Sequence, residues 1–356
     1  MTTIAVLPGD GIGPEVTHAS QRVLQFVRPD LECIEAQVGG AALAAGLPAL
    51  PEGTRALCER SAAILFGSVG LPQYEGRKLQ ERPEYALFLL RRDFQLYANI
   101  RPVRVFSGLE AASTLKPEFV RGLDLVVIRE LTGGIYFGQP KETRTIDGVE
   151  TAIDTMIYRP LEVERIARVA FELAAKRRNL VTSIDKQNIL ETSRLWRRVV
   201  TEVARDYPSV RLEHLLVDNA AMQLVRAPKA FDVMLTENMF GDILSDEAAV
   251  LTGSIGNLPS ASLGAGGDPG RQFGLYEPIS GTAPDIAGKG IANPVAAILS
   301  AAMLLRHSAG DEVGAQRIET AVEKTIAAGA RTADLAQSGE TALSSAEFTD
   351  RVLGCC

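Results

Sequence analysis

Two aspartates four residues apart, Asp242 and Asp246, are the residues of this chain with the most distinctive chemistry. In a helix, side chains at this spacing lie on one face, one turn apart. Two carboxylates held so close repel each other unless a cation lies between them, and oxygen ligands suit Mg²⁺ or Mn²⁺. A solvated acidic helix face would carry the same pattern. The pair alone leaves both interpretations open.

The sequence just before the acidic pair favours the metal site. Residues 231–236 (FDVMLT) form an apolar run of strand-forming side chains, and residues 237–241 (ENMFG) are typical of the turn that follows. We therefore expect a strand, a turn and then a helix that carries both aspartates. Ligand sites of α/β proteins lie at the carboxyl ends of strands, where this order puts the pair.

Further strands are expected at residues 4–7, 62–66 and 125–128, each followed by a loop or turn. The first is followed by a glycine-containing turn and by Pro14, which suits the start of a helix. The turn does not match the dinucleotide-binding fingerprint, because Pro14 stands where a third glycine is required. This alternation of strands and helices predicts the α/β class.

Three arginines, Arg91, Arg101 and Arg129, are expected near the ends of such elements. The guanidinium group suits two-pronged binding of carboxylates. A surface salt bridge is the alternative for each of them alone.

Composition narrows the classes of function. The chain has 356 residues, 46% of them hydrophobic and 23% charged, as in a globular protein with one large or two ordinary domains. A net charge of −7 argues against a nucleic-acid partner. No segment has the pattern of a signal peptide or the length of a membrane span, so a cytoplasmic protein without a membrane partner is expected. The four cysteines and three histidines show no metal-ligand spacing.

Five long motifs give the chain a resemblance to a known family. They are residues 9–15 (GDGIGPE), 129–138 (RELTGGIYFG), 185–188 (DKQN), 238–246 (NMFGDILSD) and 283–294 (APDIAGKGIANP). In this order they resemble the 3-isopropylmalate branch of the isocitrate/isopropylmalate family of β-decarboxylating dehydrogenases. The resemblance covers essentially the whole chain.

The resemblance implies a two-domain fold with a central mixed sheet flanked by helices, which is not a Rossmann fold. Residues 1–97 with 253–356 would form the cofactor-binding domain. Residues 98–252 would form the domain for metal binding and dimerisation.

The resemblance also implies a reaction, the NAD-dependent and metal-assisted oxidative decarboxylation of 3-isopropylmalate to 4-methyl-2-oxopentanoate in leucine biosynthesis. Lys186 matches the base and Tyr136 the acid that returns a proton to the product. Asp218, Asp242 and Asp246 match the ligands of Mg²⁺ or Mn²⁺. In the family, Lys186 and Asp218 serve the partner subunit's site, so a homodimer with shared active sites is expected.

Further positions match residues that bind the two small molecules. Those implied to bind the substrate are Arg91, Arg101, Arg129, Asp218, Leu87 and Phe88. Those implied to bind the cofactor are Glu84, Gly281, Thr282, Ala283, Pro284, Asp285, Ile286 and Asn293. An acidic side chain at position 285 would bind the ribose hydroxyls and repel a 2′-phosphate, which favours NAD over NADP.

Several positions depart from the usual family pattern, among them Tyr85 and Ala86, where a smaller pair is often found. Phe88 stands where many relatives have leucine, Ser280 where many have histidine, and Asn257 where an apolar residue is usual. Because Phe88 changes an apolar pocket, a methylthioalkyl- or aryl-substituted malate is an alternative substrate. A non-catalytic regulatory homologue is a further alternative, disfavoured because the matching metal ligands, Lys186 and Tyr136 are all present.

No binding role is expected for two further segments, residues 161–178 and 264–270. An amphipathic helix is expected over 161–178, with Lys176, Arg177 and Arg178 closing its carboxyl end and not forming a binding patch. The glycine-rich residues 264–270 lack the lysine of a phosphate-binding loop and are interpreted as a flexible surface insertion.

Overall fold

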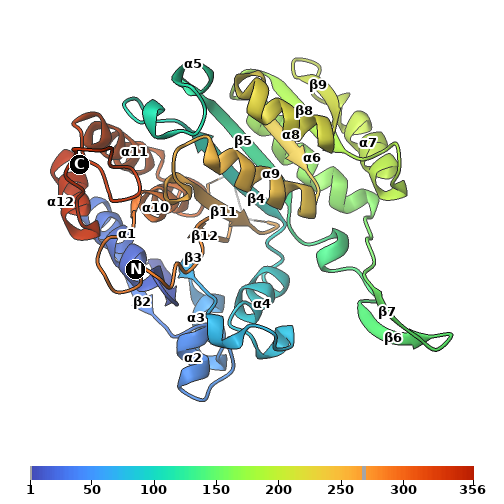
Figure 1. Cartoon of the computed structure of the whole chain (residues 1–356), viewed down its shortest axis with the longest axis horizontal. Helices are drawn as coiled ribbons and strands as arrows, with labels where there is room; N and C mark the ends of the chain where they lie inside the picture. The colour runs from blue at the N-terminus through green and yellow to red at the C-terminus, as the bar shows by residue number, and fades with distance from the viewer. Residues whose placement is uncertain (1, 267–269) are drawn as a thin grey trace. The chain divides into compact units, whose positions relative to one another are not determined.

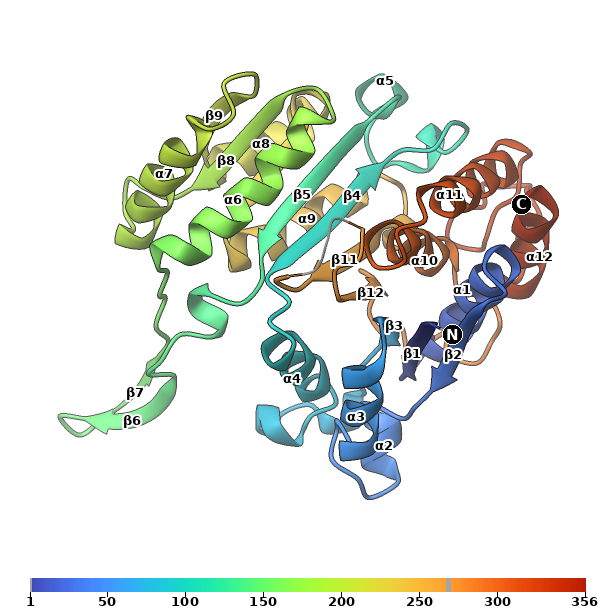
Figure 2. The same ribbon diagram turned by 180° about the vertical axis from the view of Figure 1, so that it is seen from behind.

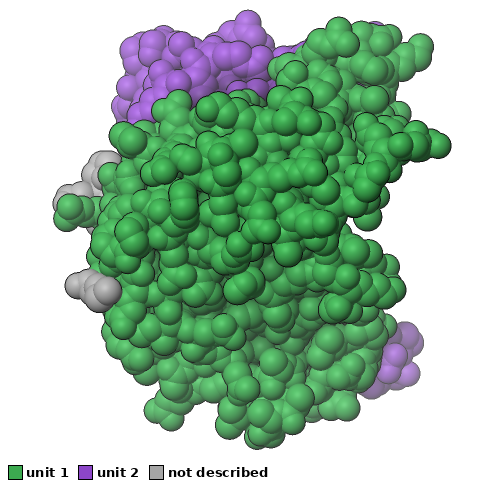
Figure 3. All heavy atoms as spheres, turned by 90° about the vertical axis from the view of Figure 1, so that its left-hand side faces the viewer, with its two compact units in different colours: residues 1–96, 104–122, 249–356 green, residues 97–103, 123–248 purple. Residues whose placement is uncertain are grey.

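The computed structural model describes residues 2–266 and 270–356, so the tip of the glycine-rich segment, 267–269, lies outside the described residues. The chain divides into two compact units (Figure 3). Unit 1 contains residues 1–96, 104–122 and 249–356, and unit 2 contains residues 97–103 and 123–248. The division into functional domains at 97/98 and 252/253 stays a prediction. The structure places residues 104–122 in unit 1.

The strands of unit 1 follow the order β2-β1-β3-β12-β11. They are β1 (Thr2–Gly9), β2 (Leu31–Glu35), β3 (Ala63–Ser68), β11 (Pro259–Leu263) and β12 (Gly274–Pro278). All neighbours run parallel except β11, which pairs antiparallel with β12. β3 is buried along its whole length, which explains its continuous apolar sequence.

The helices of unit 1 are α1 (Gly13–Val27), α2 (Gly40–Ala44), α3 (Glu52–Arg60), α4 (Tyr85–Asp93), α5 (Pro117–Val120), α10 (Val295–His307), α11 (Glu312–Ala327) and α12 (Ser345–Cys355). Among them, α4 carries Leu87, Phe88 and Arg91, three of the residues predicted to bind the substrate. α10 is buried on all sides and packs against α1, α11 and the strands β11 and β12. This burial explains why the helix is apolar without a polar face.

The strands of unit 2 follow the order β4-β5-β10-β8-β9. They are β4 (Ala98–Arg104), β5 (Asp124–Glu130), β8 (Leu180–Asp185), β9 (Arg211–Leu216) and β10 (Val233–Thr236). β10 runs parallel to β5 and β8, and β8 runs parallel to β9. A separate antiparallel hairpin contains β6 (Glu142–Ile146) and β7 (Val149–Ile153).

Helices cover both faces of the unit 2 strands. α6 (Pro160–Ala175) and α7 (Glu191–Ala204) lie on one face, and α8 (Val217–Arg226) and α9 (Asn238–Val250) lie on the other (Figures 1 and 2). The predicted mixed sheet flanked by helices is therefore confirmed, and the strand orders are not those of a Rossmann fold. Among the helices of the described ranges, none is both long and apolar enough to cross a membrane.

A glycine sets the distance between α9 and β5. A Cβ atom on Gly241 would lie 2.3 Å from Thr236 Oγ1 and 2.7 Å from Arg129 Cγ. The helix can approach the strand this closely only because position 241 has no side chain. Asp242, the next residue, is thereby brought to the arginine on β5.

We expect Gly241→Ala to lower the melting temperature of the protein by several degrees. The added methyl group must push α9 away from β5, and such overpacking costs about 1–3 kcal/mol. Gly53→Ala is the matched control, because Gly53 lies in α3 with no atom near its missing Cβ. Thermal unfolding followed by circular dichroism would measure both. Equal melting temperatures for the two variants would contradict the close approach.

Candidate functional site

The acidic pair of α9 lies among arginines from two neighbouring strands. Arg129 on β5 forms an ion pair with Asp242. Arg101 on β4 places Nη1 3.7 Å from Asp242 Oδ1 and 3.6 Å from Asp246 Oδ1. Four of the predicted residues are therefore brought together. The two guanidinium groups offset the repulsion between the carboxylates.

A buried amide fixes the orientation of Arg129, which is 2% exposed. Asn238 Oδ1 accepts hydrogen bonds from Nε and Nη2 of Arg129, at 3.0 and 2.8 Å. The Asn238 side chain donates to the carbonyl of Gly133, and its backbone N–H donates to the hydroxyl of Tyr158. These bonds leave the guanidinium one orientation, which directs Nη1 toward Asp242.

Glu237 supports the start of α9. Its carboxylate accepts hydrogen bonds from the backbone N–H groups of Met239 and Phe240, which lie in the first turn and have no partner within the helix. Burial raises the pKa of Glu237 above its ordinary value. Glu237, Asn238 and Tyr158 were not predicted as functional residues. Glu237 directly precedes the quoted motif 238–246 and Asn238 is its first residue, whereas nothing in the sequence marks Tyr158.

Arg101 is held in a similar way. Its Nε donates to Asn99 Oδ1 at 2.7 Å, and its Nη1 donates to Ser245 Oγ at 2.6 Å. Asn99 and Ser245 are both fully buried. Because buried polar groups of this kind stay hydrogen-bonded, they fix the guanidinium against the acidic pair. Neither residue is predicted from the sequence as part of the site.

Tyr136 lies at the end of a short 3-10 helix, Gly134–Tyr136, and donates a hydrogen bond from its hydroxyl to Asp242 Oδ2 at 3.1 Å. The side chain is 37% exposed, so it is not a core residue despite its apolar neighbours. Burial raises the pKa of Tyr136, and the negative charge of Asp242 raises it further. The tyrosine thus stays protonated and can donate a proton.

Lys186 and Asp218 form a second, separate pair. Lys186 follows β8, Asp218 lies in the first turn of α8, and Nζ is 2.7 Å from Oδ1. The hydrogen bond from Lys186 lowers the pKa of Asp218. Within residues 2–266 and 270–356, no three His, Cys, Asp or Glu side chains come close enough to hold a metal ion. One chain therefore does not join Asp218 to Asp242 and Asp246.

Arg91 lies on α4 in unit 1 and forms an ion pair with Glu277 of β12, at 3.1 Å between Nη2 and Oε1. Both side chains are largely buried. The Nε atom of Arg91 is buried without a hydrogen-bond partner. The guanidinium is thus held by Glu277 through Nη2, while one of its donors is left unpaired inside the protein.

The other predicted residues of α4 face different surroundings. Leu87 and Phe88 are partly buried, and the ring of Phe88 stacks on that of Tyr85 at 5.9 Å between centroids. Glu84 precedes the helix and forms an ion pair with Arg82 at 2.7 Å. The helix thus presents an apolar surface beside its charged ends.

The predicted cofactor segment packs against the turn that follows β1. The N–H of Ile12 donates to the carbonyl of Thr282 at 2.9 Å. A Cβ atom on Gly11 would lie 2.0 Å from that carbonyl oxygen, so only glycine fits there. Asp285 is exposed in the same segment, and Ala283 has a positive φ of 38°. The turn and the predicted cofactor segment are therefore in direct contact. The residues of this segment are Gly281, Thr282, Ala283, Pro284, Asp285 and Ile286.

Glu15 on α1 fixes the residues that follow this segment. Its carboxylate accepts hydrogen bonds from the N–H groups of Gly290 and Ala292, at 3.2 and 2.8 Å. The hydroxyl of Ser345, at the start of α12, donates a third hydrogen bond to the same carboxylate. Glu15 and Ser345 were missed by the sequence analysis, although Glu15 belongs to one of the quoted motifs.

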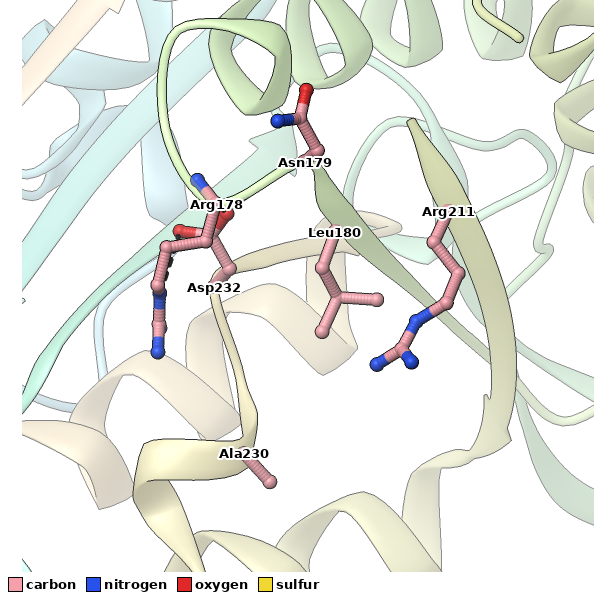
Figure 4. A pocket seen from close by; sticks show the side chains of 6 residues that line it. All are labelled: Arg178, Asn179, Leu180, Arg211, Ala230 and Asp232. Carbon is pink, nitrogen blue, oxygen red and sulfur yellow. Dashed lines mark hydrogen bonds and ion pairs between the residues drawn. The ribbon is translucent and has the colours of Figure 1, made fainter. Parts of the chain in front are cut away.

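A pocket of about 450 Å³ lies elsewhere in unit 2, at the amino ends of β8 and β9 (Figure 4). It is lined by Arg178, Asn179, Leu180, Arg211, Ala230 and Asp232. Asp232 is buried and accepts from Arg177 Nε and from the backbone N–H of Arg178. The two other charged lining residues are also paired, Arg178 with Asp232 and Arg211 with Glu213. Its charges are therefore already paired, and the pocket lies at the strand ends opposite to those where α/β proteins bind ligands.

These contacts correct the prediction for residues 176–178. The helix α6 ends at Ala175, and the side chains of Arg177 and Arg178 do not cap it. They reach instead to Asp232 and to the carbonyl of Asp124, where β10 and β5 begin. The capping prediction is wrong for these two arginines because carboxylates distant in sequence attract them more strongly than the helix end does.

The donor set of the acidic pair fits a divalent cation. Asp242 and Asp246 offer oxygen atoms only, which is the preference of Mg²⁺ and Mn²⁺. Burial raises the pKa of Asp246, while the charge of Arg101 opposes this shift. A cation of charge +2 would stabilise the partly buried negative charges of the two carboxylates more than one arginine can.

Comparisons with known proteins agree with this arrangement. A family described as isocitrate/isopropylmalate dehydrogenase matches residues 3–352. A 3-isopropylmalate dehydrogenase of Bordetella avium is 56% identical over 98% of both chains. One of Priestia megaterium is 55% identical over 94% of this chain and 90% of its own. The crystal structure of an isocitrate dehydrogenase from Methylococcus capsulatus has a TM-score of 0.88 at 34% identity, and covers 100% of this chain and 99% of its own.

We expect Asp246→Asn to weaken Mn²⁺ binding by about tenfold or more, because a carboxylate ligand is lost. The electron paramagnetic resonance signal of free Mn²⁺ measures this affinity. Glu247→Gln removes the same charge one residue away and serves as the control. Equal affinities for the two variants would exclude Asp246 as a ligand.

Proposed function

We propose a reaction for this chain from one premise: the chain belongs to the isocitrate/isopropylmalate dehydrogenase family. It catalyses the NAD-dependent and metal-assisted oxidative decarboxylation of 3-isopropylmalate to 4-methyl-2-oxopentanoate, a step of leucine biosynthesis. The observation that carries the proposal is the cluster of Arg101, Arg129 and Tyr136 around the acidic pair. These groups supply anion binding, cation binding and a proton donor in one place.

The reaction requires that a hydride leave C2 for NAD⁺, that the C2 hydroxyl lose its proton, and that the C3 carboxylate leave as CO₂. Arg91, Arg101 and Arg129 bind the substrate carboxylates, and Lys186 accepts the hydroxyl proton. Tyr136 then donates a proton to C3 of the enol. A bound divalent cation, held by Asp218, Asp242 and Asp246, would polarise the C2 oxygen and offset the negative charge that develops there.

The protonated state of Tyr136 supports its role as the acid. Its raised pKa keeps the proton on the hydroxyl at neutral pH. Its hydrogen bond to Asp242 directs the phenol toward the acidic pair. The same carboxylate thus orients the proton donor and is a proposed ligand of the cation.

The cofactor is NAD, and its adenosine half is assigned to unit 1. Asp285 is exposed beside Ile286, where its carboxylate can accept hydrogen bonds from the two ribose hydroxyls. A 2′-phosphate would meet the same negative charge, which disfavours NADP. Glu84 is assigned to the nicotinamide half, and Asn293 to the adenine.

The substrate side chain is assigned to Leu87 and Phe88. An apolar surface suits an isopropyl group, whereas the extra carboxylate of isocitrate would lose its hydration there at a cost of several kcal/mol. Because Phe88 changes the shape of this apolar surface, a second candidate is the same reaction on a malate with a bulkier methylthioalkyl or aryl substituent. A regulatory role is disfavoured because the chain retains every proposed catalytic residue.

A homodimer would complete the active site. In one chain, Asp218 is 60% exposed and pairs with Lys186 away from the other two aspartates. Exposed apolar side chains lie on α8 and α9, among them Met222, Val225 and Ile243, at 61%, 49% and 59%. Exposed apolar side chains on these two helices favour an interface if they form one patch. We assign it to a second copy, which would bring its Lys186 and Asp218 to the acidic pair.

The proposed activity is tested by NADH formation at 340 nm with Mg²⁺ or Mn²⁺. The substrates would be 3-isopropylmalate, a 2-(methylthio)alkylmalate, 3-benzylmalate, D-malate and isocitrate. We expect kcat/KM for 3-isopropylmalate to exceed that for isocitrate by about a hundredfold or more, because of the unpaired carboxylate. Activity should be lost on chelation and should be far lower with NADP. A preference for a bulkier malate would favour the second candidate, and activity on none would exclude both.

Shared sites predict complementation between two inactive variants. Lys186→Met and Asp242→Asn chains, each with its own affinity tag, would be co-expressed and the mixed dimer isolated by both tags. One of its two sites then combines Asp242 of the Lys186→Met chain with Lys186 of the Asp242→Asn chain and is intact. About half of the wild-type activity is therefore expected. The control pairs Lys186→Met with Asp218→Asn, which the same subunit lends to its partner's site. This dimer retains one site without the lysine and one without the aspartate and should stay inactive. Inactivity of the first mixed dimer would contradict shared sites.

A further inference from the structure

Asn257 departs from the family pattern and has a defined role in the structure. It ends the 3-10 helix Ile255–Asn257 and is buried, with 3% of its surface exposed. Its Nδ2 donates to the carbonyl of Thr252 at 3.2 Å, so its Oδ1 is directed the other way. That oxygen accepts a hydrogen bond from Nδ2 of Asn293 at 3.0 Å. An apolar residue at position 257 could not make this bond.

Asn293 is the residue assigned to the adenine, and its amide group has three partners within the chain. Nδ2 donates to Asn257 and also to Asp334 Oδ2, each at 3.0 Å. Oδ1 accepts from the N–H of Val295 at 3.0 Å. A carboxylate only accepts and a backbone N–H only donates, so the amide cannot turn over.

The carboxylate of Asp334 is itself anchored. Ser254 donates to Oδ2, the oxygen that also accepts from Asn293. Thr332 donates to Oδ1. These contacts fix Asp334 as an acceptor for Asn293, so both hydrogens of the Asn293 amide are used inside the protein. The remaining lone pair on Asn293 Oδ1 is the only hydrogen-bonding capacity that this amide can offer to a ligand.

We propose that Asn257 and Asp334 are specificity-determining residues that turn Asn293 into a pure hydrogen-bond acceptor for the purine of the dinucleotide. This proposal rests on the proposed function, in which Asn293 meets the adenine. The 6-amino group of adenine can donate to Asn293 Oδ1. A purine with an oxygen at position 6 would place a second acceptor against it and would be rejected.

The test compares NAD⁺ with nicotinamide hypoxanthine dinucleotide, which differs from it only at position 6 of the purine and its adjacent ring nitrogen. We expect the wild-type enzyme to show a kcat/KM about tenfold or more higher with NAD⁺, because one hydrogen bond is replaced by a repulsive contact. In Asn257→Leu/Asp334→Ala both acceptors are gone, so that only the N–H of Val295 still favours the original orientation, and the amide can turn to donate. The preference should then fall to about twofold, with each single variant between the two limits.

Two controls isolate the effect. Gln316→Leu removes a carboxamide from the exposed surface of α11 and should keep the wild-type preference. The KM for 3-isopropylmalate should stay unchanged in all variants, because none of the altered residues belongs to the proposed substrate-binding set. If the double variant is inactive or unstable, binding of the two reduced dinucleotides to Asn257→Leu, measured by calorimetry, decides the question through the same ratio.

The possible results distinguish a failure of the proposed purine selection from a failure of the proposed function. Equal use of the two dinucleotides by the wild-type enzyme would overturn the inference while leaving the reaction intact. An undiminished preference in the double variant, or in Asn257→Leu by calorimetry, would overturn it as well, because another group would then select the purine. Absence of NADH formation by the wild-type enzyme on every substituted malate would instead refute the proposed function.

Discussion

The ion pair between Arg129 and Asp242 is the contact on which the site in unit 2 depends. The guanidinium of Arg129 is almost fully buried, and a buried charge without a partner costs several kcal/mol. The protein therefore has to bring α9 close to β5, and Gly241 makes that approach possible. Asn238 accepts hydrogen bonds from Nε and Nη2 of Arg129. The second oxygen of Asp242 accepts a hydrogen bond from the hydroxyl of Tyr136. One ion pair thus places the proposed proton donor, anion-binding group and metal ligand together.

In both units, hydrogen bonds with polar groups orient parts of the predicted site, but the kinds of groups differ. In unit 2, charged groups are held by buried amides and hydroxyls, namely Asn238, Asn99 and Ser245. In unit 1, the carboxylate of Glu15 holds backbone N–H groups of the residues after the predicted cofactor segment. In unit 2 these polar groups, which do not belong to the predicted set, fix residues that do, whereas in unit 1 Glu15 fixes the backbone just before the predicted residue Asn293. Such arrangements pre-organise a site before a ligand binds.

Local sequence patterns predicted the parts of the site that depend on nearby residues. The strand, turn and helix that place Asp242 and Asp246 follow from hydrophobic periodicity over residues 231–246. Tyr158 could not be predicted, because its role arises only when the segment before α6 meets Asn238, 80 residues away in the chain. Asn99 is close to Arg101 in sequence, but no pattern in the sequence marks it as the partner of that arginine. The role of Asn257 likewise depends on Asn293, 36 residues away in the chain. The capping prediction for Arg177 and Arg178 failed for the same reason, since Asp232 is remote in sequence.

The most direct test of the account is to locate the cation in crystals of the protein grown with Mn²⁺ and a substituted malate. Anomalous scattering at the manganese edge marks the ion independently of the protein atoms. We expect a peak within about 2.1–2.3 Å of carboxylate oxygens of Asp242 and Asp246, and of Asp218 contributed by a second copy. A manganese peak remote from the acidic pair, or one that leaves Asp218 paired only with Lys186, would contradict it.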